Sequence, residues 1–410
     1  MQNDISLKKN INLPLLIFYG LGNTLGAGIY VLVGKVAGLA GLFAPIAFVV
    51  SSLIVIFTAL TYAELSARYP LSAGEAVYIH RGLGLKWLAV FVGLLICTAG
   101  IVSAATICLG FIGYFQVFID IPDRLALVLL IITLGGIAAW GIKEAVTTAA
   151  VFTIIEIIGL FLIIVTGMDN ISLDHLREME LFPAWDGAVW LSILNGAFLA
   201  VYAFLGFEDM VNVAEEVRCP ERNMPLGIVL TLLISTALYV MVSFVAVIAV
   251  PVESLQQSKA PLALVYQYST GKDPVLISII SMFAVINGAL IQIIMSTRIL
   301  YGMSSQKWLP KLFSKVNKHT HTPLVATMFV VSLLLTAALL LPLVTLAKTT
   351  SFLLLIVFGL VNLALIFLKR RQPYAPNIRT YPVLIPVFGL IFSFGMVFFE
   401  VFTGRLFIVP

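Results

Sequence analysis

Charged residues are scarce in this sequence. Asp, Glu, Lys and Arg make up 11% of its 410 residues, hydrophobic residues make up 61%, and the mean hydropathy is +1.09. A soluble protein would carry about twice that charged fraction, so the composition excludes an ordinary soluble domain. Cysteine is also rare, and the three cysteines show no metal-ligand spacing, which argues against a disulfide framework and predicts packing thiols. They are Cys97, Cys108 and Cys219.

Motifs of several functional classes are missing as well. The sequence shows no Ser/His/Asp constellation, no His-x-x-Glu-His pattern and no nucleotide-binding loop. We therefore expect neither an enzyme nor an ATP-driven pump, and we expect no cofactor and no metal ion. The net charge of +4 comes with no basic face or recognition fold, so nucleic acid is not an expected partner.

What the sequence does contain is long apolar runs. Runs of about 20 residues are long enough to cross the hydrocarbon core of a bilayer as a helix. They predict an all-α polytopic membrane protein, with a single transmembrane domain over 1–410 and eleven spans. The predicted spans are 14–37, 42–66, 87–115, 124–141, 147–167, 190–214, 226–250, 275–302, 324–342, 349–368 and 382–402.

The distribution of Lys and Arg predicts the orientation of these spans. With the N-terminus inside, 17 of the 24 basic residues fall on the cytoplasmic side, which favours that orientation. Lys8 and Lys9 precede the first span without a small-residue cleavage site after it, so we expect this span to be retained. The expected location is the cell (inner) membrane, with the N-terminus in the cytoplasm.

Glycines interrupt two of the predicted spans. The first span contains Gly26-Ala27-Gly28, and the sixth contains Gly206, followed at once by Glu208 and Asp209. Glycine lets the backbone leave helical geometry, and backbone groups freed in lipid must line a cavity or meet a partner. Matching interruptions in two halves of a chain indicate the binding site of a transporter. The alternative is close helix packing at small residues.

Two broken helices side by side would suit a zwitterion. The N–H end of a half-helix carries partial positive charge and suits a carboxylate, whereas the C=O end suits an ammonium group. Spans one to five and six to ten would then form two repeats, over 11–167 and 188–369, with an additional helix at 382–402. An odd number of spans per repeat would turn the second repeat upside down.

Four segments of the sequence resemble those of a known family, the amino acid–polyamine–organocation permeases. The resemblance covers essentially the whole chain, and its most specific part is the sixth-span signature. It implies a fold similar to the leucine transporter, with two inverted five-helix repeats, although the family typically has twelve spans. The segments that carry it are "LGAGIYVLVG", "YAELSARYPLSAGEAVYIHRGLG", "YAFLGFEDMVNVAEEVRCPERNMPLGI" and "GALIQIIMSTRILYGMSSQKWLPKLF".

The resemblance also implies roles for individual residues. Backbone N–H groups of the first span should hold the substrate carboxylate, and carbonyl groups of both interrupted spans should receive its ammonium group. Phe207 resembles the aromatic gate of the family, with ordinary core packing as the alternative. The expected substrate-binding residues are Thr24, Gly26, Ala27, Gly28, Tyr202, Ala203, Leu205 and Gly206.

Glu156 lies near the middle of the fifth span. A carboxylate there costs about 2.5–3.5 kcal/mol on insertion scales, so it needs a partner or a function. The resembling proton-coupled permeases have Lys at this place, so Glu156 is a departure. We expect proton coupling through Glu156, with sodium coupling or a structural hydrogen bond as alternatives. Ser296 and Thr297 of the eighth span match the region that supplies hydroxyls opposite the fifth.

Other ionisable residues lie closer to helix ends. We expect Glu64 and Arg298 to form ion pairs at the cytoplasmic ends of their helices, and Lys35 and Glu400 to reach water at the outer interface.

The sequence thus predicts a secondary active amino acid transporter that works by alternating access. An amino acid or polyamine exchanger and a substrate-sensing receptor with the same fold remain alternatives. Because the expected socket is largely backbone, it does not indicate which amino acid fits.

Overall fold

The computed structural model describes residues 9–71, 74–119, 121–140, 146–169, 182–317, 320, 322–373, 375–376 and 378–403. These residues form helices joined by short connections, and the β pairing among them is an isolated bridge between Ile11 and Val217. Nine helical segments of the described chain are long and apolar enough to cross a membrane, alongside shorter apolar helices. The prediction of an all-α polytopic membrane protein is therefore confirmed.

Each predicted span falls on a helix, and the sixth extends beyond its helix into a 3-10 helix. The corresponding helices are α1 (Leu13–Ala40), α2 (Ala44–Arg68), α4 (Lys86–Phe115), α5 (Asp123–Trp140), α6 (Val146–Met168), α8 (Gly187–Phe204), α9 (Pro220–Ala249), α12 (Val275–Ser305), α13 (Leu324–Leu340), α14 (Leu343–Arg371) and α15 (Leu384–Thr403). Shorter elements lie between them. These are α3 (Gly74–Leu83), α10 (Val252–Gln257), α11 (Pro261–Thr270) and the 3-10 helices η1 (Gly41–Phe43), η2 (Glu208–Glu216) and η3 (Lys311–Ser314).

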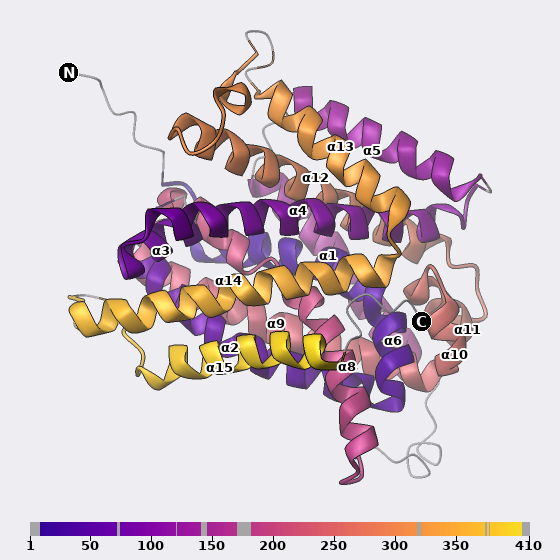
Figure 1. Cartoon of the computed structure of the whole chain (residues 1–410). Coiled ribbons are helices and arrows are strands. Elements are labelled where there is room, and N and C mark those ends of the chain that lie inside the picture. The colour runs from indigo at the N-terminus through magenta and orange to yellow at the C-terminus, as the bar shows by residue number, and fades with distance from the viewer. Residues whose placement is uncertain are drawn as a thin grey trace.

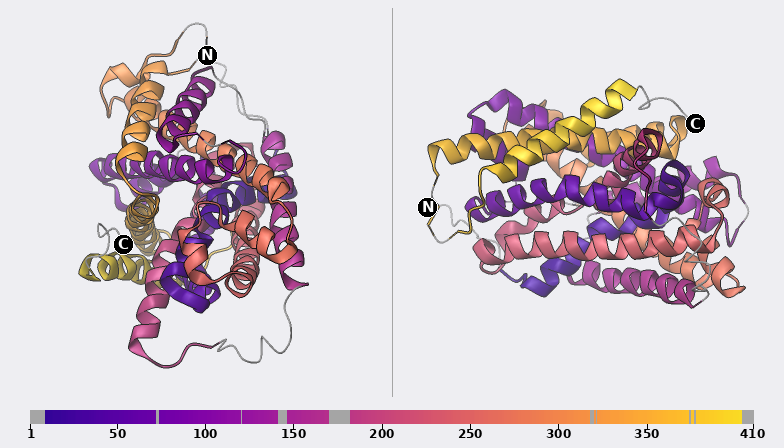
Figure 2. Two further views of the ribbon diagram at one scale, coloured as in Figure 1. Left: turned by 90° about the vertical axis from the view of Figure 1, so that its right-hand side faces the viewer. Right: turned by 90° about the horizontal axis from the view of Figure 1, so that it is seen from below.

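The helices form a bundle around α1 (Figure 1). α1 contacts α6, α8, α9 and α12, and α4 lies along α12 and α14. α5 and α13 lie side by side at the edge of the bundle, and α15 lies on α14 and α2 (Figures 1 and 2). Outer helices expose large apolar side chains such as Ile132, Met328 and Phe402. Such surfaces are costly in water but suit the lipid that a membrane provides.

The predicted break in the first span is wrong, because α1 is a continuous helix across Gly26-Ala27-Gly28. The glycines of α1 instead allow neighbours to come close. A Cβ atom on Gly28 would lie 2.7 Å from the Cβ of Ala203 on α8, and one on Gly34 would meet the carbonyl oxygen of Leu255. The packing alternative therefore describes α1, whose backbone groups stay within the helix.

The predicted break in the sixth span is confirmed. α8 ends at Phe204, Leu205 has extended backbone, and the φ angle of Gly206 is 124°. Residues with a side chain rarely adopt that φ, and a Cβ on Gly206 would lie 2.6 Å from the carbonyl carbon of Asn23. The freed N–H of Gly206 donates to Oε2 of Glu208 at 2.7 Å. The chain then continues as η2, so α8 and η2 are two halves of an interrupted span.

Candidate functional site

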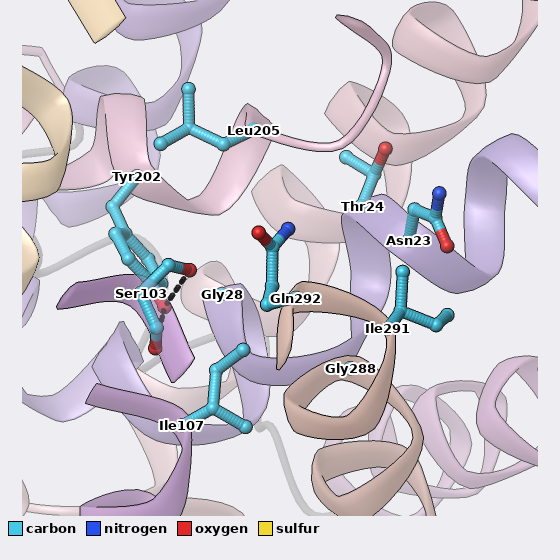
Figure 3. A pocket seen from close by; sticks show the side chains of 10 residues that line it. All are labelled: Asn23, Thr24, Gly28, Ser103, Ile107, Tyr202, Leu205, Gly288, Ile291 and Gln292. Carbon is cyan, nitrogen blue, oxygen red and sulfur yellow. Dashed lines mark hydrogen bonds between the residues drawn. The ribbon is translucent and has the colours of Figure 1, made fainter. Parts of the chain in front are cut away.

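A small cavity, here called the central cavity, lies where four helices meet beside the α8 break (Figure 3). Its volume of about 20 Å³ is space for about one water molecule. A larger ligand therefore requires the side chains or helices that line the cavity to move. The cavity is lined by Asn23, Thr24 and Gly28 of α1, Ser103 and Ile107 of α4, Tyr202 and Leu205 at the end of α8, and Gly288, Ile291 and Gln292 of α12.

The side-chain amide of Asn23 lines the central cavity without a hydrogen-bond partner among the described residues. Both its amide nitrogen and its amide oxygen are buried, and neither is hydrogen-bonded to any described residue. Buried polar groups are normally paired, so this amide is available to a ligand as donor and acceptor. Asn23 was not among the predicted site residues, although a polar side chain one turn before Gly26 in an apolar span could have indicated it.

The other polar side chains of the central cavity are paired within the protein. The hydroxyls of Ser103 and Tyr202 lie 3.0 Å apart, and the Tyr202 hydroxyl also donates to the Ser103 carbonyl at 3.2 Å. Gln292 donates from Nε2 to Oδ2 of Asp209 at 3.2 Å. In the view of Figure 3, Gln292 lies between the α8 residues on one side and Thr24 on the other. Ser103 and Gln292 were also missed from the sequence.

Tyr239 of α9 engages two of the carbonyl groups expected to receive an ammonium group. Its hydroxyl lies 2.6 Å from the carbonyl oxygen of Thr24 and 2.6 Å from that of Ala203. Tyr239 is fully buried and does not line the central cavity. These two carbonyls therefore have a protein partner already, and Tyr239 ties α1 to the end of α8.

The expected substrate-binding residues divide into two groups. Thr24, Gly28, Tyr202 and Leu205 line the central cavity, and the structure brings them together from two helices. The remaining residues do not line it. Gly26 faces the Ala284 carbonyl of α12, Ala203 packs on Gly28, Gly206 packs on Asn23, and the side chain of Ala27 lies outside the described residues.

Phe207, the expected gate, lies in an aromatic cluster next to the break. Its side chain is fully buried, and its ring centroid lies 5.6 Å from that of Tyr62 and 5.5 Å from that of Phe358. It does not line the central cavity. This geometry is that of core packing, and a gating role for Phe207 stays a prediction.

Glu156 of α6 is buried, and neither of its carboxylate oxygens has a hydrogen-bond partner among the described residues. Its backbone carbonyl accepts from the Tyr30 hydroxyl at 2.6 Å. α6 contacts α12 on both sides of Glu156. Phe152 stacks on Phe283, and Gly159 lies against Ile280. Phe152 and Gly159, about one turn to either side of Glu156, therefore pack on the first half of α12.

Ser296 and Thr297 lie well away from Glu156. Thirteen residues separate Phe283 from Ser296 along α12, which is about 20 Å of helix. The Ser296 hydroxyl donates to the Cys97 carbonyl at 3.3 Å, so it faces α4. The hydroxyl of Thr297 is buried without a described partner. The structure thus does not bring the three residues expected for ion coupling together.

A second cavity of about 20 Å³, the inner cavity, adjoins the central one. The two share Ser103, Leu205 and Gln292 as a partition. Beyond that partition the inner cavity contacts the buried carboxyls of Glu208 and Asp209. The two cavities therefore follow the seam between α4 and α12 towards the end of the bundle where α4 begins and α12 ends.

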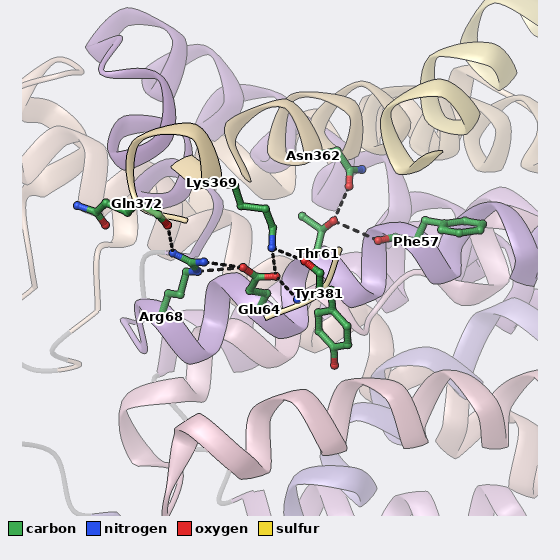
Figure 4. A network of polar contacts seen from close by, with 8 residues as sticks. All are labelled: Phe57, Thr61, Glu64, Arg68, Asn362, Lys369, Gln372 and Tyr381. Carbon is green, nitrogen blue, oxygen red and sulfur yellow. Dashed lines mark hydrogen bonds and ion pairs between the residues drawn. The ribbon is translucent and has the colours of Figure 1, made fainter. Parts of the chain in front are cut away.

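Buried ion pairs lie outside these cavities. Glu64 of α2 pairs with Arg68 at 2.8 Å and with Lys369 of α14 at 2.6 Å, and it also accepts from the backbone N–H of Tyr381 at 2.9 Å (Figure 4). The expected ion pairing of Glu64 is confirmed. Glu64 thereby ties α2, α14 and the connection to α15 together.

The expectation that Glu400 reaches water is wrong. The Glu400 side chain of α15 is fully buried and forms an ion pair with Lys348 of α14 at 2.8 Å. A buried carboxylate needs a counter-charge, and Lys348, 52 residues earlier in the chain, supplies it. This pair fixes the additional C-terminal helix to the rest of the bundle.

Comparisons with known proteins bear on the whole chain. Residues 11–408 match the model of a family described as amino acid permease. The branched-chain amino acid permease BcaP of Bacillus subtilis is 29% identical, over 95% of this chain and 87% of its own length. Cationic amino acid transporter 3 of Arabidopsis thaliana is 31% identical, over 78% of this chain and 56% of its own length.

A third relative is named for a substrate that is not an amino acid. The methylthioribose transporter of Bacillus subtilis is 27% identical, over 90% of this chain and 83% of its own length. The family and these relatives are transporters rather than enzymes. With a match that spans nearly all of an all-helical membrane bundle, the chain belongs to the amino acid permease family.

Proposed function

We propose that this chain is a secondary active amino acid transporter that binds its substrate in the central cavity and works by alternating access. The observation that carries the proposal is the interrupted span beside that cavity. The C=O end of α8 carries partial negative charge and suits the ammonium group of an amino acid. The unpaired amide of Asn23 lies in the same cavity and suits either charged end.

Alternating access follows from the arrangement of the cavities. The central cavity holds about one water molecule, so substrate binding must be accompanied by movement of α1, α4, α8 or α12. The Gln292–Asp209 hydrogen bond crosses the partition between the central and inner cavities. Breaking this contact would join the two cavities and open a route towards the expected cytoplasmic side.

The two inverted repeats remain part of this proposal, over 11–167 and 188–369. Their first helices would be α1 and the α8–η2 pair, which pack closely at Gly28 against Ala203 and at Gly206 against Asn23. In this chain one of the pair is interrupted and the other is continuous. The proposed location is the cell membrane with the N-terminus in the cytoplasm, as the Lys and Arg distribution favours.

Glu156 is our proposed coupling residue. An ionised carboxylate without a partner is costly to bury, so a bound proton or a bound cation would have to balance it. We favour the proton because neither carboxyl oxygen of Glu156 is hydrogen-bonded to a described residue, and a protonated carboxyl group costs less to bury unpaired than an ionised one. Sodium is the rival coupling ion, and the experiment below separates the two.

The test is uptake of labelled amino acids into proteoliposomes that contain the purified protein. An inward proton gradient should drive accumulation, a protonophore should abolish it, and replacing sodium with choline should leave it unchanged. Glu156→Gln should remove the response to pH, whereas the exposed Glu253→Gln should keep it. Accumulation that needs sodium would assign the coupling to that ion, and exchange without net uptake would identify an exchanger.

Binding without any flux would instead identify a substrate-sensing receptor. The substrate panel should include branched-chain and basic amino acids, polyamines and methylthioribose, because the relatives are named for different substrates. Saturable uptake of an amino acid is the result that supports the proposal.

A further inference from the structure

A larger cavity, here called the outer cavity, lies at the end of the bundle where α1 and α4 end and where α5 and α14 begin. Its volume is about 270 Å³, a little below the roughly 300–1,000 Å³ of pockets for drug-sized ligands. That volume suits a smaller molecule such as a single amino acid. The lining residues are Val31, Lys35, Leu109, Ile112, Asp123, Arg124, Leu127, Ser258, Lys259, Ala338, Leu339, Leu341, Pro342 and Leu343.

The outer cavity lies next to the central cavity along the same two helices. On α1, Gly28 lines the central cavity and Val31 the outer one, one helical turn further on. On α4, Ile107 lines the central cavity and Leu109 the outer one. Between them Val31 packs against Gly110, where a Cβ atom would lie 2.7 Å from Cγ1 of Val31. This close apolar contact joins α1 and α4 beside both cavities.

The mouth of the outer cavity carries more positive than negative charge. Lys35, Arg124 and Lys259 line it, against the single carboxylate of Asp123. Lys259 uses that carboxylate in an ion pair of 2.6 Å, and the ammonium group of Lys35 contacts the Gln256 carbonyl. Arg124 is exposed and forms no ion pair with any described residue. Its guanidinium group is thus open to an anion.

We propose that the outer cavity is a second ligand site, in which Arg124 and Lys35 bind the carboxylate of an amino acid before it reaches the central cavity. A guanidinium group matches a carboxylate with two parallel hydrogen bonds. The apolar side chains of Val31, Leu109 and Ile112 would receive the aliphatic part of the ligand. The inference rests on the proposed function, because it assigns the transported amino acid to a second site that it occupies before the central cavity.

Uptake kinetics in proteoliposomes test this site. Arg124→Gln and Lys35→Gln should each raise the KM for amino acid uptake about three- to tenfold and leave the maximal rate unchanged, because they weaken capture and not the later steps. Lys272→Gln is the matched control: it removes an exposed positive charge outside the cavity and should leave KM unchanged. Raising the ionic strength should raise the KM of the unaltered protein more than that of Arg124→Gln.

Two further measurements distinguish an amino acid carboxylate from a lipid headgroup as the anionic ligand of this site. Inhibition of uptake by the amine that lacks the carboxylate should be equal for the unaltered protein and Arg124→Gln. Vesicles of neutral lipid should preserve the difference in KM between the two proteins. If that difference appears only with anionic lipid, the site holds a lipid headgroup and the inference is overturned.

An unchanged KM in both cavity variants, or a lower maximal rate at unchanged KM, would also overturn it. Failure of the proposed function has a different signature, namely no saturable uptake by the unaltered protein. In that case amino acid binding to the purified protein is compared by titration calorimetry. Arg124→Gln must then weaken binding at least threefold, and equal binding by both proteins refutes the site.

Discussion

The hydroxyl of Tyr239 links α1 and α8, two of the four helices that border the central cavity. It lies 2.6 Å from carbonyl oxygens of both α1 and α8, and its ring packs against Phe48 and Phe204. One hydroxyl proton shared between two buried carbonyls replaces the solvent that those carbonyls lose on folding. Tyr239 thus fixes the end of α8 at the point where the chain leaves helical geometry.

We predict that Tyr239→Phe destabilises the protein and slows transport. The variant keeps the ring but removes this donor from both carbonyls, and the Ala203 carbonyl at the end of α8 loses a hydrogen bond that the helix does not replace, which costs about 1–3 kcal/mol of unfolding free energy. A lower melting temperature in detergent and a lower maximal uptake rate should follow. Tyr268→Phe is the control, since Tyr268 is exposed. Equal melting temperatures for Tyr239→Phe and the unaltered protein would show that the hydroxyl contributes nothing.

Glu75 of α3 provides a test of pH dependence. Burial raises the pKa of its carboxyl from 4.5 to about 7, against smaller opposing effects of a backbone hydrogen bond and of the hydrogen bond that the Tyr62 hydroxyl donates at 3.3 Å. The folded chain then binds this proton more tightly than the unfolded chain. Stability from this group is therefore complete below about pH 4.5 and falls until about pH 7, by up to about 3 kcal/mol.

Glu75→Gln removes that loss of stability. The variant should melt at a higher temperature than the unaltered protein at pH 8 and at a similar temperature at pH 5. The exposed Glu253→Gln should leave the difference between the two pH values intact. Parallel melting curves for Glu75→Gln and the unaltered protein across this range would contradict the burial argument.

Between helices, α1 and α8 approach each other closely at the central cavity. Gly28 permits it, because a Cβ there would lie 2.7 Å from the Cβ of Ala203 and 2.9 Å from its carbonyl oxygen. We predict that Gly28→Val forces α1 and α8 apart and abolishes uptake, while Gly136→Ala on α5 has little effect because open space surrounds Gly136. Normal uptake by a folded Gly28→Val protein would show that the contact is not required.

The anchoring of α15 gives a second test between helices. Glu400→Gln removes the carboxylate that lies 2.8 Å from the buried ammonium group of Lys348, and removing one partner of a buried ion pair costs about 3–5 kcal/mol. The melting temperature should fall markedly. The double replacement Lys348→Met with Glu400→Leu should recover most of that loss, since neither charge then remains buried. A double variant as unstable as the single one would argue against this explanation.

In the whole bundle, the positions of the spans can be predicted from the sequence, because the thickness of the bilayer sets the length and hydropathy that each helix needs. The predicted span 275–302, for example, matches α12 at Val275–Ser305. The α8 break was also predictable, since Gly206 is followed by Glu208, whose carboxylate accepts the freed N–H. In both cases the deciding residues are local in the chain.

Features that depend on distant partners were not predictable. The glycines of α1 fit both a break and close packing, and what decides between them is Ala203 on another helix. Tyr239 meets Thr24 across 215 positions, and Lys348 neutralises Glu400 across 52. The carbonyl groups expected to bind a ligand accept from Tyr239, and the carboxylate expected to reach water pairs with Lys348. No local sequence pattern indicates either partner.

The most direct test of the central claim is amino acid binding to purified Gly206→Ala beside Gly136→Ala. Alanine at position 206 is strained at a φ of 124° and brings a Cβ to 2.6 Å from the Asn23 carbonyl carbon, whereas position 136 has open space. If the interrupted span binds the substrate, Gly206→Ala should lose binding while staying folded, and Gly136→Ala should bind normally. Equal binding by both variants would contradict the account.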